Sequence, residues 1–190
     1  MTTLPVGSRD HAGGPKDSIQ ELAREIATDL NCGTPVALGF ECPLFVPLPE
    51  DPNYLTSARV GEKDRAWSAG AGAACLATGL TETVWILEKI RAGLIKPVAA
   101  HLEWKSFRAS GTGLFLWEAF VTKMAKRLSH QGDAEAAVEY FYSRMPDVDE
   151  HNAISCTRVR SLIGAAILQT GWETDLALLG SSCIVLRVDG

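Results

Sequence analysis

The hydrophobic pattern first predicts an amphipathic helix near the N-terminus. Five apolar residues recur on one face at helical spacing: Ile19, Leu22, Ala23, Ile26 and Leu30. Asp17 and Ser18 are both good N-caps, and Ser18 forms a capping box with Glu21. Asn31 and Gly33 supply the helix end. The first regular element is therefore expected to end near residue 31.

Short apolar runs predict the strands. Residues 36–40 read as a buried strand, and the tail 183–188 reads as the last one. Residues 97–104 and 114–120 read as two further strands, and the turn between them has a spacing that permits a hairpin.

The remaining apolar spacing predicts helices. Their expected ranges are 66–79, 81–92, 121–130, 134–144 and 152–170. Asp133 is a good N-cap for the fourth of these. The first two ranges are consistent either with two helices or with one kinked helix. The three prolines between residues 47 and 52 predict an irregular loop over 43–65.

This element order predicts an α/β domain in which a small mixed sheet is flanked by several helices. We expect a flexible N-terminal arm over residues 1–16 and a single domain over 17–190, because 190 residues suit one domain.

Composition narrows the class of protein. Hydrophobic residues make up 46% of the chain and charged residues 22%, which is typical of a globular protein and excludes a disordered or collagen-like chain. The opening residues lack a signal peptide, and no apolar run approaches the ~18 residues of a membrane span. The five cysteines never form a C-x-x-C pair, which favours free thiols and a cytoplasmic location with no membrane partner.

The charge balance bears on nucleic-acid binding. Lys and Arg number 18 against 23 Asp and Glu, a net charge of −5, so a uniform basic face is absent and only local basic patches could contact phosphates. Three such groups occur around Arg59, Lys126 and Arg158, and solvated surface is the simpler reading of each.

Acids placed beside apolar strands are the main candidates for chemistry. Glu41 directly follows the strand 36–40, and Glu118 lies within the apolar run 114–120. If the two strands are neighbours, these acids could meet at one sheet edge, with Asp149 or Glu150 as a third carboxylate. Clustered carboxylates suit Mg²⁺ or Mn²⁺, and two such ions stabilise a phosphodiester displacement. Alternatively, Glu118 ends a strand at the surface or pairs with an Arg or Lys.

Other features have simpler explanations. Arg59 or Arg65 could hold an anionic substrate beneath the loop 43–65. Cys42 with His101 could be imagined as a nucleophile and base, but no local signature supports this. The G-x-G-x-x-C run at 70–75 does not follow a strand, so helix packing explains it better than nucleotide binding.

Three segments together resemble the predicted nucleases of ribonuclease H-like fold. The first is Leu38-Gly39-Phe40-Glu41-Cys42-Pro43-Leu44, with Arg59-Val60-Gly61-Glu62 downstream. The second is the apolar run around Glu118, and the third is Asp149-Glu150-His151-Asn152-Ala153. The resemblance covers residues 36–170 in order. It implies a ribonuclease H-like fold and a metal-dependent nuclease in which Glu41 and Glu118 are catalytic and, with Asp149 and Glu150, bind metal.

The chain departs from this pattern at its N-terminus. The family's first strand carries an Asp, and here Asp10 is the only candidate, with no apolar strand before it. Asn152 and Ser155 also stand where acids are often found. Three functions therefore stay open: a Mg²⁺- or Mn²⁺-dependent nuclease, a non-catalytic scaffold or binding module that could form a homo-oligomer, and a small-molecule enzyme with the 43–65 loop as a lid.

Overall fold

The computed structural model describes residues 15–62, 66–122 and 124–189. The helices are α1 (Pro15–Asn31), α2 (Gly70–Ala92), α3 (Trp104–Ser110), α4 (His130–Ser143) and α5 (Leu162–Gln169). The strands are β1 (Val36–Phe40), β2 (Phe45–Pro47), β3 (Ala100–His101), β4 (Leu114–Val121), β5 (Val159–Ser161) and β6 (Val185–Val188). Three short 3₁₀ helices complete the list: η1 (Pro52–Tyr54), η2 (Val148–His151) and η3 (Leu176–Gly180).

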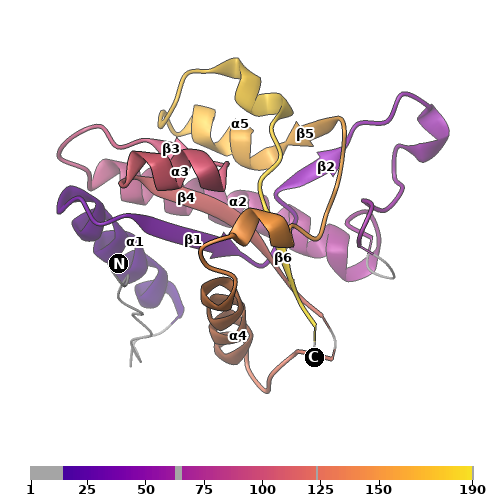
Figure 1. Ribbon diagram of the computed structural model, residues 1–190, viewed down its shortest axis with the longest axis horizontal. Coiled ribbons are helices and arrows are strands. Elements are labelled where there is room, and N and C mark those ends of the chain that lie inside the picture. Colours follow the sequence, from indigo (N-terminus) through magenta and orange to yellow (C-terminus); the bar gives the residue numbers. More distant parts are fainter. Residues whose placement is uncertain (1–14, 63–65, 123, 190) are drawn as a thin grey trace.

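Strand β4 is the centre of a parallel sheet (Figure 1). On one side it pairs with β1, which places Phe40 opposite Glu118. On the other side β3 pairs with the start of β4 and β6 pairs with its end, where Val185 lies opposite Glu118. Since β4 is covered on both faces, its sequence is a continuous apolar run interrupted only by Glu118. A separate antiparallel pair, β2 and β5, lies beside this sheet.

Helices cover both faces of the sheet, so the domain has two apolar cores. Leu114 and Leu116 of β4 pack with α1, α2 and α5 on one face. Phe115 and Trp117 point to the other face and pack with α3 and α4. The α/β class expected from the sequence is confirmed, but the expected mixed sheet is wrong, because β1, β3 and β6 all pair with β4 in parallel.

The N-terminal helix, the strand 36–40 and the strand 114–120 are confirmed. Residues 1–14 of the expected flexible arm lie outside the described residues, and α1 already begins at Pro15. The two helices expected over 66–79 and 81–92 form the single helix α2. Gly79 lies within it where the helix touches Cys42, and a Cβ there would come within 2.4 Å of the Cys42 sulfur.

The expected hairpin at 97–120 is wrong. Within the first expected strand, 97–104, only Ala100 and His101 are in a strand. Trp104 begins α3, and Gly111, with a positive φ, caps the end of this helix. The helical spacing of Trp104 and Phe107 brings both rings onto Phe115, at centroid distances of 5.2 and 5.4 Å. This aromatic packing makes the segment a crossover helix, so β3 and β4 run parallel.

Two expected helices are also wrong over part of their length. The described residues of 121–129 form no helix, because Val121 continues β4 and Ser129, not Asp133, caps α4. The helix expected over 152–170 starts only at Leu162, because the preceding backbone pairs elsewhere: Ser155 bridges Val60, and β5 pairs with β2.

One helix in the described part of the chain, α2, is long and apolar enough to cross a membrane by length and composition alone. Its C-terminal half contributes Ile86, Leu87 and Ile90 to the core against α1 and α5. Length and composition are weak evidence here, and the absence of a membrane partner stays a prediction.

His101 in β3 gives a pH-dependent prediction for stability. Burial lowers the pKa of this imidazole, with Glu173 acting in the opposite sense, and its Nε2 has no hydrogen-bond partner. The unfolded state therefore takes up the proton first, and stability that is present above the unfolded pKa of 6.5 is lost as the pH falls below it. We expect the stability advantage of wild type over His101→Gln to shrink between pH 7.5 and 5.5 in urea titrations. A gap that stays constant or widens would contradict this.

Candidate functional site

Glu118 is a buried carboxylate in the middle of β4, and only 1% of it is exposed. Its two oxygens accept hydrogen bonds from the Arg59 guanidinium at 2.8 and 2.6 Å. The backbone N–H of Leu44 donates a third bond at 3.0 Å. Glu118 thus pairs with an arginine, which was the alternative reading of its place in the sequence.

Arg59 reaches this position from the loop after β2, and only 3% of it is exposed. Its Nε donates to Glu62 at 2.8 Å, and its guanidinium lies 4.8 Å from the centre of the Phe45 ring. Glu62 also accepts from the backbone N–H groups of Arg59 and Trp67. All sides of the guanidinium are in contact with the protein, so Arg59 is not placed to hold a substrate. Arg65, its predicted companion, lies outside the described residues.

The electrostatics of this buried group favour the ionised pair. Burial raises the pKa of Glu118, and the hydrogen bonds and charge of Arg59 oppose that rise. Burial also lowers the pKa of Arg59, but its bonds to Glu118 outweigh this and the net shift is upward. Two guanidinium bonds and one amide bond all favour the charged carboxylate, so we treat both groups as charged.

Glu41 follows β1 and lies at the surface, where Lys126 approaches it to 3.4 Å. Lys126 also contacts Asp133 of α4 at 3.3 Å, which links the ends of β1 and β4 to the first turn of that helix. The Asp133 carboxylate accepts from the backbone N–H of Arg127 at 2.6 Å, and this bond lowers the pKa of Asp133. Glu41 thus belongs to a surface ion pair, and the group around Lys126 is not a free basic patch.

The other two predicted metal ligands lie on η2. Asp149 pairs with the exposed Lys105 at 3.2 Å, and Glu150 is exposed. Across the described ranges, no group of three or more His, Cys, Asp or Glu side chains could hold a metal ion. The structure therefore does not gather Glu41, Glu118, Asp149 and Glu150 at one point, and a metal site stays a prediction.

Cys42 is a buried thiol. Burial, with the charge of Glu118, raises its pKa to about 12, so it stays protonated at neutral pH. It follows the end of β1, whereas His101 pairs with Phe115 near the start of β4. The imagined pair of Cys42 and His101 is therefore split between opposite ends of the sheet.

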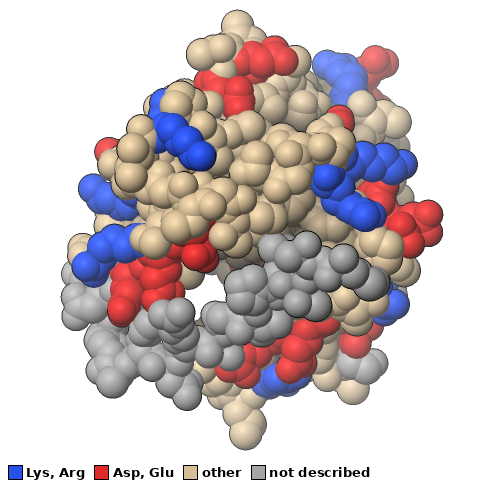
Figure 2. Space-filling model, turned by 60° about the vertical axis from the view of Figure 1, so that its left-hand side comes forward, with Lys and Arg blue, Asp and Glu red and all other residues tan. Residues whose placement is uncertain are grey.

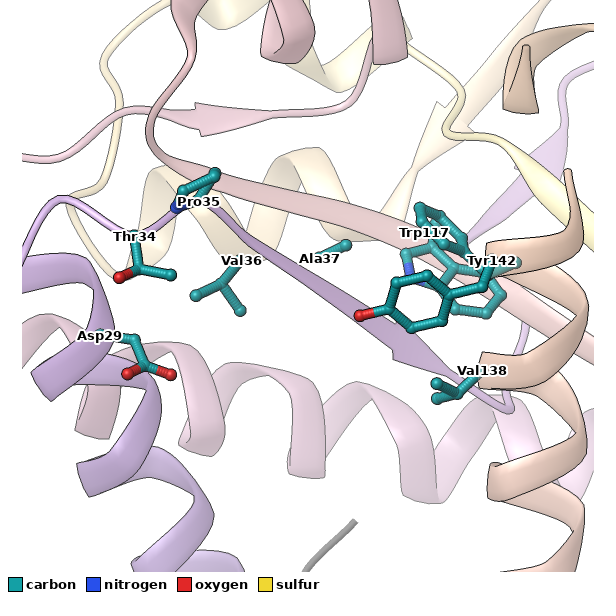
Figure 3. Close-up of a pocket in the computed structure, with 9 residues that line it drawn as sticks. Asp29, Thr34, Pro35, Val36, Ala37, Trp117, Val138 and Tyr142 are labelled. Carbon is teal, nitrogen blue, oxygen red and sulfur yellow. The ribbon is translucent and has the colours of Figure 1, made fainter. Parts of the chain in front are cut away.

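A pocket of about 130 Å³ lies beside β1, between α1 and α4 (Figure 3). Val36 and Ala37 both line it, although successive side chains of a strand point to opposite faces. The pocket therefore lies along the edge of the sheet and not on one face. Pro35, Val138 and Phe141 add to its apolar wall.

Polar groups reach this pocket from three elements. Asp29 comes from the end of α1, and its carboxylate has no ion-pair partner among the described residues. Tyr142 comes from α4, and Figure 3 shows its hydroxyl pointing away from that helix in front of β1. Trp117 of β4 lies over Gly39, where a Cβ would come within 2.5 Å of the indole ring. The Trp117 Nε1 is buried and has no hydrogen-bond partner in the described structure.

Sequence reasoning missed this pocket because its lining comes from four separated segments. In the sequence, Asp29 is an ordinary polar residue near the end of a helix. Tyr142 lies within a predicted helix and belongs to no motif. Gly39 next to an apolar strand end was the one available signal, since a glycine inside a strand often marks a close approach.

Comparisons with family models, curated proteins and solved structures find no match for this chain. The mixed α/β architecture stands on the structure alone.

The buried pair predicts a large and non-additive effect on stability. Replacing Glu118 by Gln leaves the Arg59 charge buried and incompletely paired, so we expect a loss of about 3–5 kcal/mol. The double variant R59M/E118L removes both charges and should cost less than the sum of the single substitutions.

Urea unfolding of wild type, Arg59→Met, Glu118→Leu and the double variant measures this coupling. Glu41→Gln is the matched control, because it breaks an exposed ion pair and should change stability by about 0–1 kcal/mol. Equal effects of Glu41→Gln and Glu118→Gln would show that the buried pair does not hold the fold.

Proposed function

We propose that this protein is a binding module that recognises a small cationic group in the pocket beside β1. The observation that carries the proposal is the pocket itself, which sets the unpaired Asp29 carboxylate and the Tyr142 hydroxyl at the edge of a sheet. No basic side chain is among its lining residues. An ammonium or guanidinium group is the ligand chemistry that complements this lining.

Size supports a small ligand. Pockets for cofactors and drug-sized molecules have volumes of about 300–1,000 Å³. A volume of about 130 Å³ suits one amino-acid side chain or a molecule of similar size.

The ribonuclease H-like arrangement is the finer fold that we propose. Its support is the sheet with helices on both faces, together with the strand, acid and Pro-Leu sequence at 36–44, whereas the entirely parallel pairing departs from the expected mixed sheet. Within that fold we propose a non-catalytic scaffold. The reason is that Glu118 already accepts three hydrogen bonds from Arg59 and Leu44, and a metal would have to displace them.

A nucleic-acid partner receives little support from the surface. Figure 2 shows acidic and basic side chains interspersed over the described part of one face, without a continuous basic area. The three basic groups seen in the sequence are partly neutralised, as at Lys126 and at Arg158, which lies 3.6 Å from Glu50.

Titration with side-chain analogues tests the binding proposal. We expect butylammonium and butylguanidinium to shift the Trp117 indole N–H resonance saturably, with a Kd of about 1–10 mM for so small a ligand. The resonance is assigned by its loss in Trp117→Phe. Asp29→Asn should weaken binding at least threefold, and Glu88→Gln, an exposed acid on α2, serves as the matched control. Equal responses to neutral butyramide, or no response at all, would refute the proposal.

Calorimetric titration of Mn²⁺ tests the nuclease alternative independently. Under the scaffold proposal we expect no saturable site that depends on Glu41, because its nearest described partner is Lys126 and not a second carboxylate. A single Mn²⁺ site that disappears in Glu41→Gln would favour the nuclease and would justify assays on nucleic-acid substrates.

A further inference from the structure

The outer edge of β1 has free backbone hydrogen-bonding groups. In its pairing with β4, the Val36 N–H donates to Gly113. Because backbone groups alternate sides along a strand, Val36, Leu38 and Phe40 face β4, whereas Ala37 and Gly39 face the opposite edge. Within the described residues, no strand pairs with that edge and no hydrogen bond to the backbone of Ala37 or Gly39 is formed. Two N–H and two C=O groups are thus available at the spacing of a β-ladder.

Strand β1 lacks the features that usually keep an edge strand from pairing with another chain. Natural edge strands are commonly protected by charged residues, proline or bulges. The sequence Val36-Ala37-Leu38-Gly39-Phe40 contains none of the first two, and it pairs with β4 in continuous register without a bulge. The Trp117 ring packs directly on Gly39, so the face of the strand is filled there and only the lateral backbone groups are offered.

The edge lies in a recess and not on a flat surface. Asp29 of α1 and Val138 and Tyr142 of α4 line the pocket that runs along it, and Figure 3 shows these two helices at opposite ends of β1. A recess between two helices admits a single extended chain. A second folded copy pairing through its own β1 would bring its own α1 and α4 to the same place, so an extended segment fits better.

We propose that β1 accepts an extended segment of a partner polypeptide as an additional strand. The segment bonds to the backbone of Ala37 and Gly39 and places a Lys or Arg side chain beside Asp29. This inference rests on the proposed function, since it names the molecule that supplies the cationic group. Main-chain bonds provide affinity in such strand addition, and the side-chain pocket provides specificity.

Selection from a displayed library of random heptapeptides on the full chain tests the proposal. We expect enriched peptides to carry Lys or Arg and to bind at micromolar Kd in fluorescence anisotropy. Ala37→Pro removes only the outward N–H, a change that edge strands tolerate, and should weaken binding at least tenfold. Glu88→Gln, the exposed control on α2, should stay within twofold of wild type.

Two further measurements do not depend on how Ala37→Pro folds. N-methylation of alternate peptide backbone nitrogens should abolish binding in one register and spare it in the other. The amides of Ala37 and Gly39 should exchange rapidly with deuterium in the free monomer and at least tenfold more slowly with peptide bound.

The alternative outcomes separate the two proposals. Peptides that lose affinity in Asp29→Asn but not in Ala37→Pro, and that tolerate N-methylation, would overturn strand addition and leave the cation pocket intact. No enrichment would overturn strand addition, and the butylammonium titration then decides the pocket separately.

Protected Ala37 and Gly39 amides in the free monomer would mean that the chain fills its own edge. Self-association lost in Ala37→Pro, measured by sedimentation, would make a second copy the occupant. Either result would overturn the proposal that a segment of a different polypeptide binds this edge.

Discussion

The ion pair between Arg59 and Glu118 connects the irregular segment after β2 to the central strand β4. Glu118 lies at the point of β4 where β1 pairs on one side and β6 on the other. Arg59 belongs to the irregular segment after β2, and its bonds to Glu118 hold that segment against the sheet, while Glu62 of the same segment fixes the guanidinium. A charge buried this deeply is tolerated only because its partner and its remaining hydrogen-bonding groups are all supplied by the protein. The segment supplies the arginine that keeps the buried Glu118 paired, and the same ion pair anchors the segment to β4.

Other contacts of the same segment reinforce this connection. Gly61 has a positive φ, and a Cβ there would come within 2.0 Å of the Ala153 carbonyl oxygen. Its own carbonyl accepts from Arg187 of β6 at 2.8 Å. The Leu44 carbonyl accepts from the first two residues of α5. The segment 43–62 is thus tied by its own side-chain and backbone hydrogen bonds to β4, β6 and α5.

This arrangement changes where a ligand is expected. In open α/β sheets, ligands usually bind in the crevice beyond the carboxyl ends of the strands. Here Arg59, Glu62 and Glu118 fill the space at the end of β1 and the middle of β4 with one another. The open part of the sheet is instead its lateral edge at β1, where backbone groups and the Asp29 carboxylate, which has no ion-pair partner among the described residues, face a small pocket. A sheet edge in a recess supports recognition of a chain more readily than catalysis on a small molecule.

The sequence by itself determined the elements whose pattern is local. The helical spacing from Ile19 to Leu30 and the apolar runs at 36–40 and 114–120 each predict their element without reference to the rest of the chain. Tertiary contacts decided the remainder, because Trp104 joins a helix through its packing on Phe115, and residues 152–161 give their backbone bonds to other segments. The same limit applies to the site. An acid inside an apolar strand signals that Glu118 needs a partner, but a guanidinium and a metal ion satisfy that need equally well in the sequence. Only the folded chain brings Arg59, 59 positions away, within 2.6 Å of Glu118 and thereby shows that a guanidinium pairs with it.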